Sequence, residues 1–285
     1  MSGMSSAADA GQRTRAERFR ALHRPGAPFV LGNAWDVASA LVLEEAGFEA
    51  VGTSSAGLAA SLGLLDAEAV TLQDLVEVVA RISRALEVPL SADIESGFGP
   101  LPSDVATCVE QVLRAGAVGV NLEDVRPGSA ELLPLEAAAE RIAAARAAAG
   151  GTGIPAVINA RTDVFWRKVG PEEERVEEAL RRLRAYVQAG ADAVFVPGAH
   201  KRTDIAQLTA RAGAPLNLLA TRDLPPLSEL ARLGVARLSL GSAPMRAALT
   251  TLRRVAEELR GPGTYKTLTE DVLSYPELQA LLAKD

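Results

Sequence analysis

Arg114-Ala115-Gly116-Ala117-Val118-Gly119-Val120 joins the end of a predicted helix to the start of a predicted strand. A glycine just after the last helical residue adopts the left-handed backbone conformation without steric cost, so it ends the helix and a strand can begin soon after. Similar stretches recur at 45–51, 188–194 and 233–237. We interpret them as a weak internal repeat whose unit is a helix followed by a strand.

Short apolar runs alternate with longer helical patterns along most of the chain, which is typical of a parallel sheet. The predicted strands begin near Phe29, Ala50, Leu90, Val118, Ala156, Ala193, Leu216 and Arg237. Helices are expected over 37–45, 72–86, 104–114, 135–148, 172–188, 227–233 and about 244–259. This α/β pattern predicts a (β/α)8 barrel, the TIM barrel, with functional groups where the strands end. A doubly wound open sheet is the alternative, but no Gly-x-Gly-x-x-Gly turn follows the first strand.

We expect three parts in the chain: an N-terminal tail over 1–20 that is disordered or helical, the barrel over 21–260, and a helical extension over 261–285. The start, Met1 to Gln12, is small and polar and has no apolar core, so it is expected to be a disordered tail and not a signal peptide. Gly261-Pro262-Gly263 breaks the last barrel helix, and 268–282 then carries an apolar pattern. This segment packs either on its own barrel or on a neighbouring subunit.

Composition indicates an ordinary globular protein, with 48% hydrophobic and 23% charged residues in 285. A net charge of −6 argues against nucleic acid as a partner, and no apolar run is long enough to span a membrane. The single cysteine, Cys108, excludes an internal disulfide framework and favours a cytoplasmic location. It falls inside a predicted helix, where a buried inert thiol is expected.

Ser91-Ala92-Asp93-Ile94-Glu95-Ser96-Gly97-Phe98-Gly99 places two carboxylates where a buried strand ends. They either cap the following turn or serve a site, and the other strand ends favour a site. The polar residues there are Asn33, Thr53 to Ser55, Glu123 with Asp124, Asn159 with Arg161 and Asp163, Asn217, and Gly241 with Ser242. Several converging carboxylates repel one another unless they are protonated or bridged by a cation. Oxygen ligands without histidine or cysteine point to Mg²⁺.

Arg161 is the one arginine at these strand ends, and a guanidinium beside such a site suits a substrate carboxylate, which it can hold through two parallel hydrogen bonds. A salt bridge to Asp163 or Glu123 is a compatible alternative. The backbone N–H groups of Ser54, Ser55 and Gly57 could also receive a carboxylate, unless this stretch is a plain flexible loop. His23 and His200 are interpreted as poor candidates for acid or base; the alternative for His200, which follows a strand end, is a place at the border of the site. Trp35 and Trp166 are interpreted as packing residues or loop anchors.

The ordered set of motifs resembles the phosphoenolpyruvate mutase and isocitrate lyase superfamily. These motifs are Asn33 to Asp36, Ser61 to Asp66, Ala92 to Gly99, Gly119 to Asp124, Asn159 to Asp163 and Ala189 to Ala193. The resemblance implies a (β/α)8 barrel, a last helix exchanged between subunits of a dimer or tetramer, and magnesium-dependent chemistry on 2-oxo acids. It implies that Asp93 binds Mg²⁺ directly while Glu95, Glu123 and Asp66 hold its waters.

The resemblance further implies that Asp66, Glu123 and Arg161 are catalytic, and that Ser54, Ser55, Gly57, Asp93, Arg161 and Asn217 bind the substrate. One departure stands out. The lyases carry Lys-Cys-Gly-His after the Glu-Asp pair, and the mutases a lysine and an Asn-Ser pair, whereas this chain has Val125 to Leu132 without either. The proton donor is therefore open among Arg126, Ser129, Glu131 and a metal-bound water.

We expect a magnesium-dependent lyase that cleaves or forms a carbon–carbon bond beside a 2-oxo or 2-hydroxy carboxylate through a pyruvate-type enolate, decarboxylation included. The expected partners are this small carboxylate and further copies of the chain. The alternatives are a mutase or hydrolase acting on the phosphorus–carbon bond of phosphonopyruvate, and a barrel that binds a dicarboxylate without turning it over. The barrel alone does not choose among them.

Overall fold

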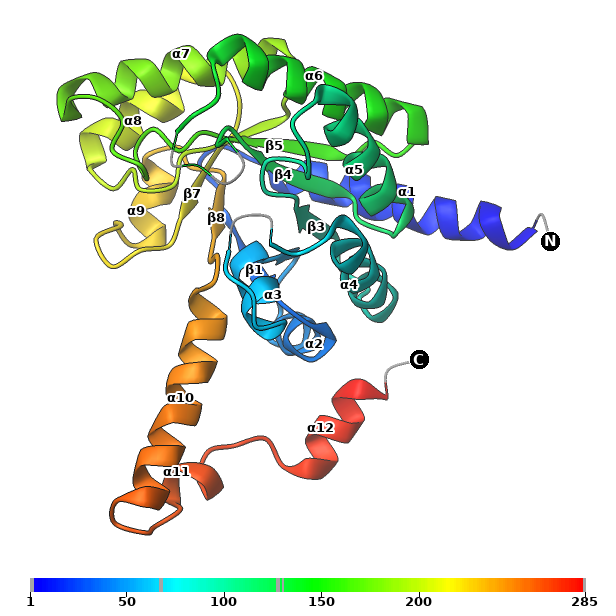
Figure 1. Ribbon diagram of the computed structural model, residues 1–285, viewed down its shortest axis with the longest axis vertical. Coiled ribbons are helices and arrows are strands. Elements are labelled where there is room, and N and C mark those ends of the chain that lie inside the picture. Colours follow the sequence, from blue (N-terminus) through cyan, green and yellow to red (C-terminus); the bar gives the residue numbers. More distant parts are fainter. Residues whose placement is uncertain (1–2, 67–68, 127–128, 130, 284–285) are drawn as a thin grey trace.

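The computed structural model describes residues 3–66, 69–126, 129 and 131–283. Eight parallel strands form a closed barrel in sequence order, with β8 paired to β1 (Figure 1). The strands are β1 Phe29–Ala34, β2 Val51–Thr53, β3 Leu90–Asp93, β4 Gly119–Glu123, β5 Val157–Arg161, β6 Ala193–Phe195, β7 Leu216–Leu219 and β8 Arg237–Ser239. The predicted barrel is therefore confirmed, and each strand begins within one residue of its predicted position.

Helices surround most of the barrel. They are α2 Val37–Glu45, α4 Leu72–Ala85, α5 Pro102–Arg114, α6 Leu135–Thr152, α7 Arg175–Gln188 after the short turn η1 Glu172–Glu174, α8 Arg202–Arg211, α9 Leu227–Arg232 and α10 Ala243–Arg260. Gly47, Gly116, Gly190 and Gly234 follow α2, α5, α7 and α9 with φ of +86°, +108°, +105° and +86°. These are the glycines of the internal repeat, so its predicted role in ending helices is confirmed.

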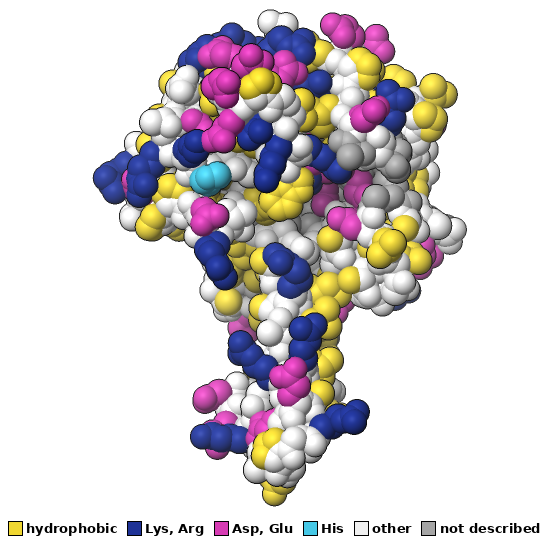
Figure 2. All heavy atoms as spheres, turned by 60° about the vertical axis from the view of Figure 1, so that its left-hand side comes forward, with side chains coloured by type: hydrophobic (Ala, Val, Ile, Leu, Met, Phe, Trp, Pro, Cys, Tyr) yellow, Lys and Arg dark blue, Asp and Glu magenta, His cyan; other side chains and the backbone are white. Residues whose placement is uncertain are grey.

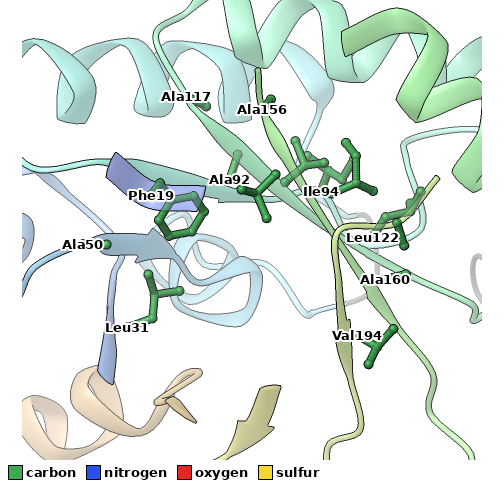
Figure 3. Packing of buried hydrophobic residues seen from close by; sticks show 14 of the residues in the cluster. Phe19, Leu31, Ala50, Ala92, Ile94, Ala117, Leu122, Ala156, Ala160 and Val194 are labelled. Atoms are coloured by element: carbon green, nitrogen blue, oxygen red, sulfur yellow. The ribbon is translucent and has the colours of Figure 1, made fainter. Parts of the chain in front are cut away.

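Helix α1 (Gly3–Leu22) closes the amino-terminal end of the barrel. The Phe19 side chain is fully buried and packs against the beginning of β1 and β4 (Figure 3). A Cβ added to Gly119 would lie 2.7 Å from the Phe19 ring, so β4 begins with glycine because the ring takes that space. Gln12 donates hydrogen bonds to the carbonyls of Leu113 and Ala117. Residues 3–12 are helical, which agrees with the helical alternative for the tail and not with the disordered one; Met1 and Ser2 lie outside the described residues.

Two further segments differ from expectation. Helix α3 (Ser55–Ser61) begins where a plain loop was the alternative, because the Ser54 hydroxyl accepts a hydrogen bond from the Gly57 amide and caps the first turn. Helix α8 was not predicted, because its sequence begins with polar residues and its buried apolar face consists of Ile205 and Leu208. Cys108 is buried inside α5, as expected.

The C-terminal part leaves the barrel. Helix α10 projects as a stalk, followed by α11 (Lys266–Thr269) and α12 (Tyr275–Leu282), which turns back until its end contacts α2 (Figure 1). Met245 is the buried residue of α10, and Leu281 is that of α12. The extension is helical as predicted, but most of its apolar side chains remain exposed. No helix in the described residues combines the length and apolar character needed to cross a bilayer.

Candidate active site

A cavity of about 150 Å³ opens at the carboxyl ends of the strands, where TIM barrels carry their active sites. On the face in Figure 2, acidic side chains lie in the hollow of the barrel beside hydrophobic ones, above the stalk. Ser54, Ser55, Asp66, Asp93 and Arg161 line this cavity together. These five predicted site residues come from 108 positions of sequence, and the barrel brings them to one place.

Asp93 ends β3 and is held by three hydrogen bonds. Its amide donates to the Thr53 hydroxyl at 2.8 Å, Oδ1 accepts from Asn121 Nδ2 at 3.0 Å, and Oδ2 accepts from the Ser55 amide at 3.3 Å. Within the described part of the chain, Asp93 takes part in no salt bridge. The carboxylate is thus fixed in orientation and lacks a contacting positive charge.

Arg161 ends β5 and is held by two acids. Its Nε and Nη2 donate to the two oxygens of Asp163 at 2.6 and 3.0 Å, and its Nη1 lies 2.8 Å from Glu123 Oε2. The structure therefore shows both of the predicted salt bridges. A guanidinium has five N–H donors, so its two hydrogen bonds to Asp163 and its ion pair with Glu123 leave N–H groups on the Nη nitrogens. These groups can still donate to a carboxylate, while the Phe195 ring lies 5.7 Å from the guanidinium carbon.

Glu123 ends β4 and is paired with Arg161. Burial raises the pKa of this carboxyl, the Arg161 charge lowers it, and the nearby acids Asp163, Asp93 and Asp66 raise it. Burial of Arg161 opposes its charge, but Glu123 and Asp163 more than compensate, so the pKa of the guanidinium lies above its ordinary value. Arg161 thus offsets only part of the burial and carboxylate repulsion, and the net effect raises the pKa of Glu123 to about 7.

Asp124, the neighbour of Glu123, points into a separate buried network. It accepts hydrogen bonds from the Thr162 hydroxyl (2.7 Å), the Asp163 amide (3.0 Å), the Tyr186 hydroxyl (2.7 Å) and Arg182 (3.2 Å). Through the Asp163 amide it fixes the turn that positions the carboxylate against Arg161. Glu123 and Asp124 therefore serve opposite sides of the barrel wall. Glu123 pairs with Arg161, whereas Asp124 belongs to the separate buried network.

Four predicted site residues lie off the cavity wall, namely Gly57, Glu95, Glu123 and Asn217. Asn217 is fully buried and exchanges hydrogen bonds with Ser239, which does line the cavity. Glu95 is buried after β3 with φ of +47°. The amides of Ser54, Ser55 and Gly57 donate to the Ala34 carbonyl, the Asp93 carboxylate and the Ser54 hydroxyl, and both serine residues line the cavity.

After Asp124, Val125 forms a β-bridge with Leu132 and the Arg126 amide donates to the Glu131 carbonyl. Of the proposed proton donors, Arg126, Ser129 and Glu131 are described, and none of them lines the cavity. Pro127, Gly128 and Ala130 lie outside the described residues.

Magnesium fits part of this arrangement. Over the described residues, no three acidic, histidine or cysteine side chains come together as a metal site, so Asp93, Glu95 and Glu123 do not form a direct ligand set. Mg²⁺, however, is commonly held by one or two carboxylates, several waters and substrate oxygens. Asp93 and Asp66 both line the cavity, and Asp93 has no cationic contact within the described chain. Asp93 is thus the carboxylate suited to hold the ion.

Several cavity residues were missed in the sequence, among them Asn121, Arg237 and Trp166. Asn121 lies two residues before Glu123 on β4, Arg237 begins β8, and Trp166 was interpreted as an anchor although it lines the cavity. Alternation is the signal that could have revealed Asn121 and Arg237, because residues two apart on a strand face the same side. Trp166 follows β5 in a segment without periodicity, so no comparable signal exists there.

The chain is a closed (β/α)8 barrel with acids and an arginine at the carboxyl end of its strands, where barrel enzymes carry their active sites. The model of the phosphoenolpyruvate phosphomutase family matches residues 19–260. The chain belongs to this family, within the phosphoenolpyruvate mutase and isocitrate lyase superfamily.

Among curated proteins, an uncharacterized protein of Mycobacterium tuberculosis strain H37Rv is 39% identical over 93% of this chain and 95% of its own length. The 2-methylisocitrate lyase of Escherichia coli K12 is 30% identical, over 91% and 89%. The oxaloacetate decarboxylase of Bradyrhizobium sp. BTAi1 is also 30% identical, over 83% and 82%. The characterised relatives are enzymes, and a lyase or mutase type of function is supported.

Two solved structures are close in fold. A putative lyase/mutase from Burkholderia cenocepacia J2315 has a TM-score of 0.89 and 38% identity, covering 96% of this chain and 98% of that one. A phosphonopyruvate hydrolase in complex with oxalate and Mg²⁺ has a TM-score of 0.82 and 29% identity, covering 94% of each. Magnesium chemistry is thus present within the superfamily.

Proposed function

We propose that this protein is a magnesium-dependent lyase that cleaves or forms a carbon–carbon bond beside a 2-oxo or 2-hydroxy carboxylate, decarboxylation included. The observation that carries the proposal is the pairing of Asp93, which has no salt bridge in the described chain, with the partly available Arg161 in one small cavity. The proposed cleavage releases a pyruvate-type enolate. The cavity volume of about 150 Å³ favours a substrate of only a few carbon atoms.

Each residue has a physical task. Arg161 holds the substrate carboxylate through its remaining N–H groups, and Asp163 with Glu123 keeps the guanidinium plane fixed. Asp93 holds Mg²⁺, with Asp66 as a second carboxylate at the rim. When bound, Mg²⁺ supplies positive charge that stabilises the negative charge developing on the substrate oxygen. The side chains of Ser54 and Ser55 lie where they can contact the same carboxylate.

The test is an assay of 2-oxo and 2-hydroxy acids with Mg²⁺ and with EDTA, on the wild type, Asp93→Asn and the matched control Asp74→Asn. Asp74 caps α4 away from the cavity. We expect turnover that EDTA abolishes and that falls at least about a hundredfold in Asp93→Asn. Metal-independent turnover, or none with any acid, would refute the proposal.

A second candidate is cleavage or rearrangement of the phosphorus–carbon bond of phosphonopyruvate, because a solved relative carries the name phosphonopyruvate hydrolase. Phosphorus NMR of an incubation with phosphonopyruvate separates the two candidates. An intact ligand after long incubation, beside magnesium-dependent binding, would instead identify a binding protein.

The oligomeric state, the cytoplasmic location and the absence of a nucleic-acid partner stay predictions. Support for oligomers comes from the apolar side chains exposed along α10 to α12.

A further inference from the structure

Arg237 is a buried cation without an ionic partner. It begins β8, is 2% exposed and lines the cavity. Its Nε donates to the Ser239 hydroxyl at 3.2 Å, whereas its Nη1 is buried without a hydrogen-bond partner. In the described part of the chain no acid forms a salt bridge with it. This contrasts with Arg161, which contacts two acids.

Such a group is costly for the protein. Burying a guanidinium without an opposite charge loses its hydration and gains little in return. The Phe19 ring lies 5.9 Å from the guanidinium carbon and gives weak compensation. Burial lowers the pKa of Arg237 to about 9, and the charge of Asp93 opposes this shift. An anion beside Nη1 would satisfy both the charge and the unused N–H groups.

The barrel places Arg237 and Arg161 along one row of paired residues. Arg161 is in register with Phe195, Phe195 with Asn217, and Asn217 with Arg237. Three strand spacings separate the two arginines, which is roughly 14 Å along the barrel wall. Both line the same cavity, so their long side chains approach it from two parts of the wall. A small ligand can therefore contact both.

The interior end of the cavity is lined by small residues. Gly52, Ser91 and Ser239 belong to β2, β3 and β8, and the Leu31 side chain packs against Gly52, where a Cβ would lie 2.6 Å from it. Asn217 holds Ser239, and Ser239 in turn accepts from Arg237 Nε, so the guanidinium is positioned by a buried polar pair. This gives the predicted site residue Asn217 a role as a positioning residue.

We propose that Arg237 forms a second anion subsite at the interior end of the cavity, which receives the second carboxylate of a diacid whose first carboxylate is bound by Arg161. The inference rests on the proposed function for the binding of the first carboxylate and narrows its substrates to short dicarboxylates. It assigns the selection of a diacid over a monoacid to one residue of β8.

The test compares malate with lactate, which shares the 2-hydroxy acid group but lacks the second carboxylate. Calorimetric titrations with Mg²⁺ use the wild type, Arg237→Met, and Arg202→Met as a matched control at an exposed ion pair with Glu229. We expect the wild type and the control to bind malate roughly ten- to a hundredfold more tightly than lactate, the range of a charged hydrogen bond. In Arg237→Met, malate affinity should fall to that of lactate, with lactate binding unchanged.

Several outcomes would overturn the subsite. Equal affinity of the wild type for both acids, binding of neither, or an unchanged malate preference in Arg237→Met would each do so. Titrations are repeated with added sodium chloride to test whether a halide is the anion that binds at Arg237. If chloride binds there, the affinity of malate falls to that of lactate when chloride is added. Tighter, Arg237-dependent binding of phosphonopyruvate than of malate would reject a carboxylate as the anion.

Folding of the variant is measured by thermal unfolding without ligand. If Arg237→Met does not fold, Arg237→Lys keeps the charge but not the planar fork, and should reduce the malate preference in part. Because binding is measured and not turnover, malate bound through Arg237 without any reaction would refute the lyase proposal alone. Turnover of acids with no role for Arg237 would refute the subsite alone.

Discussion

Asn121 Nδ2 donates a hydrogen bond of 3.0 Å to Asp93 Oδ1, and Asn121 Oδ1 accepts one of 2.8 Å from Asn159 Nδ2. Side chains of β3, β4 and β5 thus form a chain that ends on the carboxylate proposed to hold the metal. Since Asn159 is fully buried and Asn121 nearly so, the chain is shielded from water and fixes the rotation of Asp93.

Asn121→Ala should weaken Mg²⁺ binding about tenfold, because an oriented ligand is replaced by one that must be ordered on binding. It should also lower the free energy of unfolding by about 1–3 kcal/mol, since Asn159 loses its acceptor. Titration calorimetry and urea unfolding measure the two effects. Asn159→Ala is the control, which should cost similar stability but less metal affinity. Equal losses of metal affinity in both variants would contradict the orienting role of Asn121.

Asp124→Asn should be among the most destabilising changes of a single charge in this protein. Asp124 is 2% exposed and accepts from Thr162, the Asp163 amide, Tyr186 and Arg182. Burial raises its pKa while the Tyr186, Thr162 and Asp163 hydrogen bonds and the Arg182 charge lower it. Breaking one side of a buried ion pair costs roughly 3–5 kcal/mol, and the lower end applies because Arg182 keeps Glu178.

A double-mutant cycle in urea with Arg182→Met checks this account. If the Asp124–Arg182 contact carries the loss, the double variant should be less destabilised than the sum of the single variants. Additive losses would show that the other three hydrogen bonds to Asp124 account for the effect.

The strand starts could be predicted because α2, α5, α7 and α9 end at a glycine and each strand is a short apolar run, both of which are local properties of the sequence. The positions of Asp93 and Arg161 followed, since strand ends of a barrel meet at one mouth. What could not be predicted depends on contacts between distant segments. The sequence alone cannot tell that the N–H donors of Arg161 contact Glu123 and Asp163. Nor can it tell that Phe19 and Gln12 stabilise the helical N-terminus against β1 and the residues before β4.

His23 should make stability depend on pH. Burial first, and then the charges of Arg237 and Arg20, lower its pKa to about 3, while its hydrogen bond with the Phe19 carbonyl raises it. The unfolded chain takes up the proton near pH 6.5, and the folded protein only near pH 3. Between these values the unfolded state binds more protons, so stability falls as the pH falls, by at most about 1.4 kcal/mol per pH unit.

The variant His23→Phe keeps an aromatic ring between Phe19 and Phe29 and removes the titration. Thermal unfolding of both proteins from pH 7 to pH 4 should show a smaller loss of stability in the variant. Parallel curves would mean that His23 already carries its proton in the folded protein, or that other groups account for the acid sensitivity.

The stalk should be an interface between copies of the chain. Leu249, Leu252 and Leu259 are 50%, 62% and 45% exposed, and their spacing of three and seven residues places them on one face of α10. Hydrophobic side chains run down one edge of the stalk in Figure 2. An apolar stripe of this kind is stable in water only when another surface covers it. Leu252→Glu should therefore shift the protein from a dimer or tetramer to a smaller species in light scattering after size exclusion, whereas Arg253→Glu on the same helix should not. A wild type that is monomeric at micromolar concentration, or equal behaviour of the two variants, would show that the stripe is not the contact between subunits.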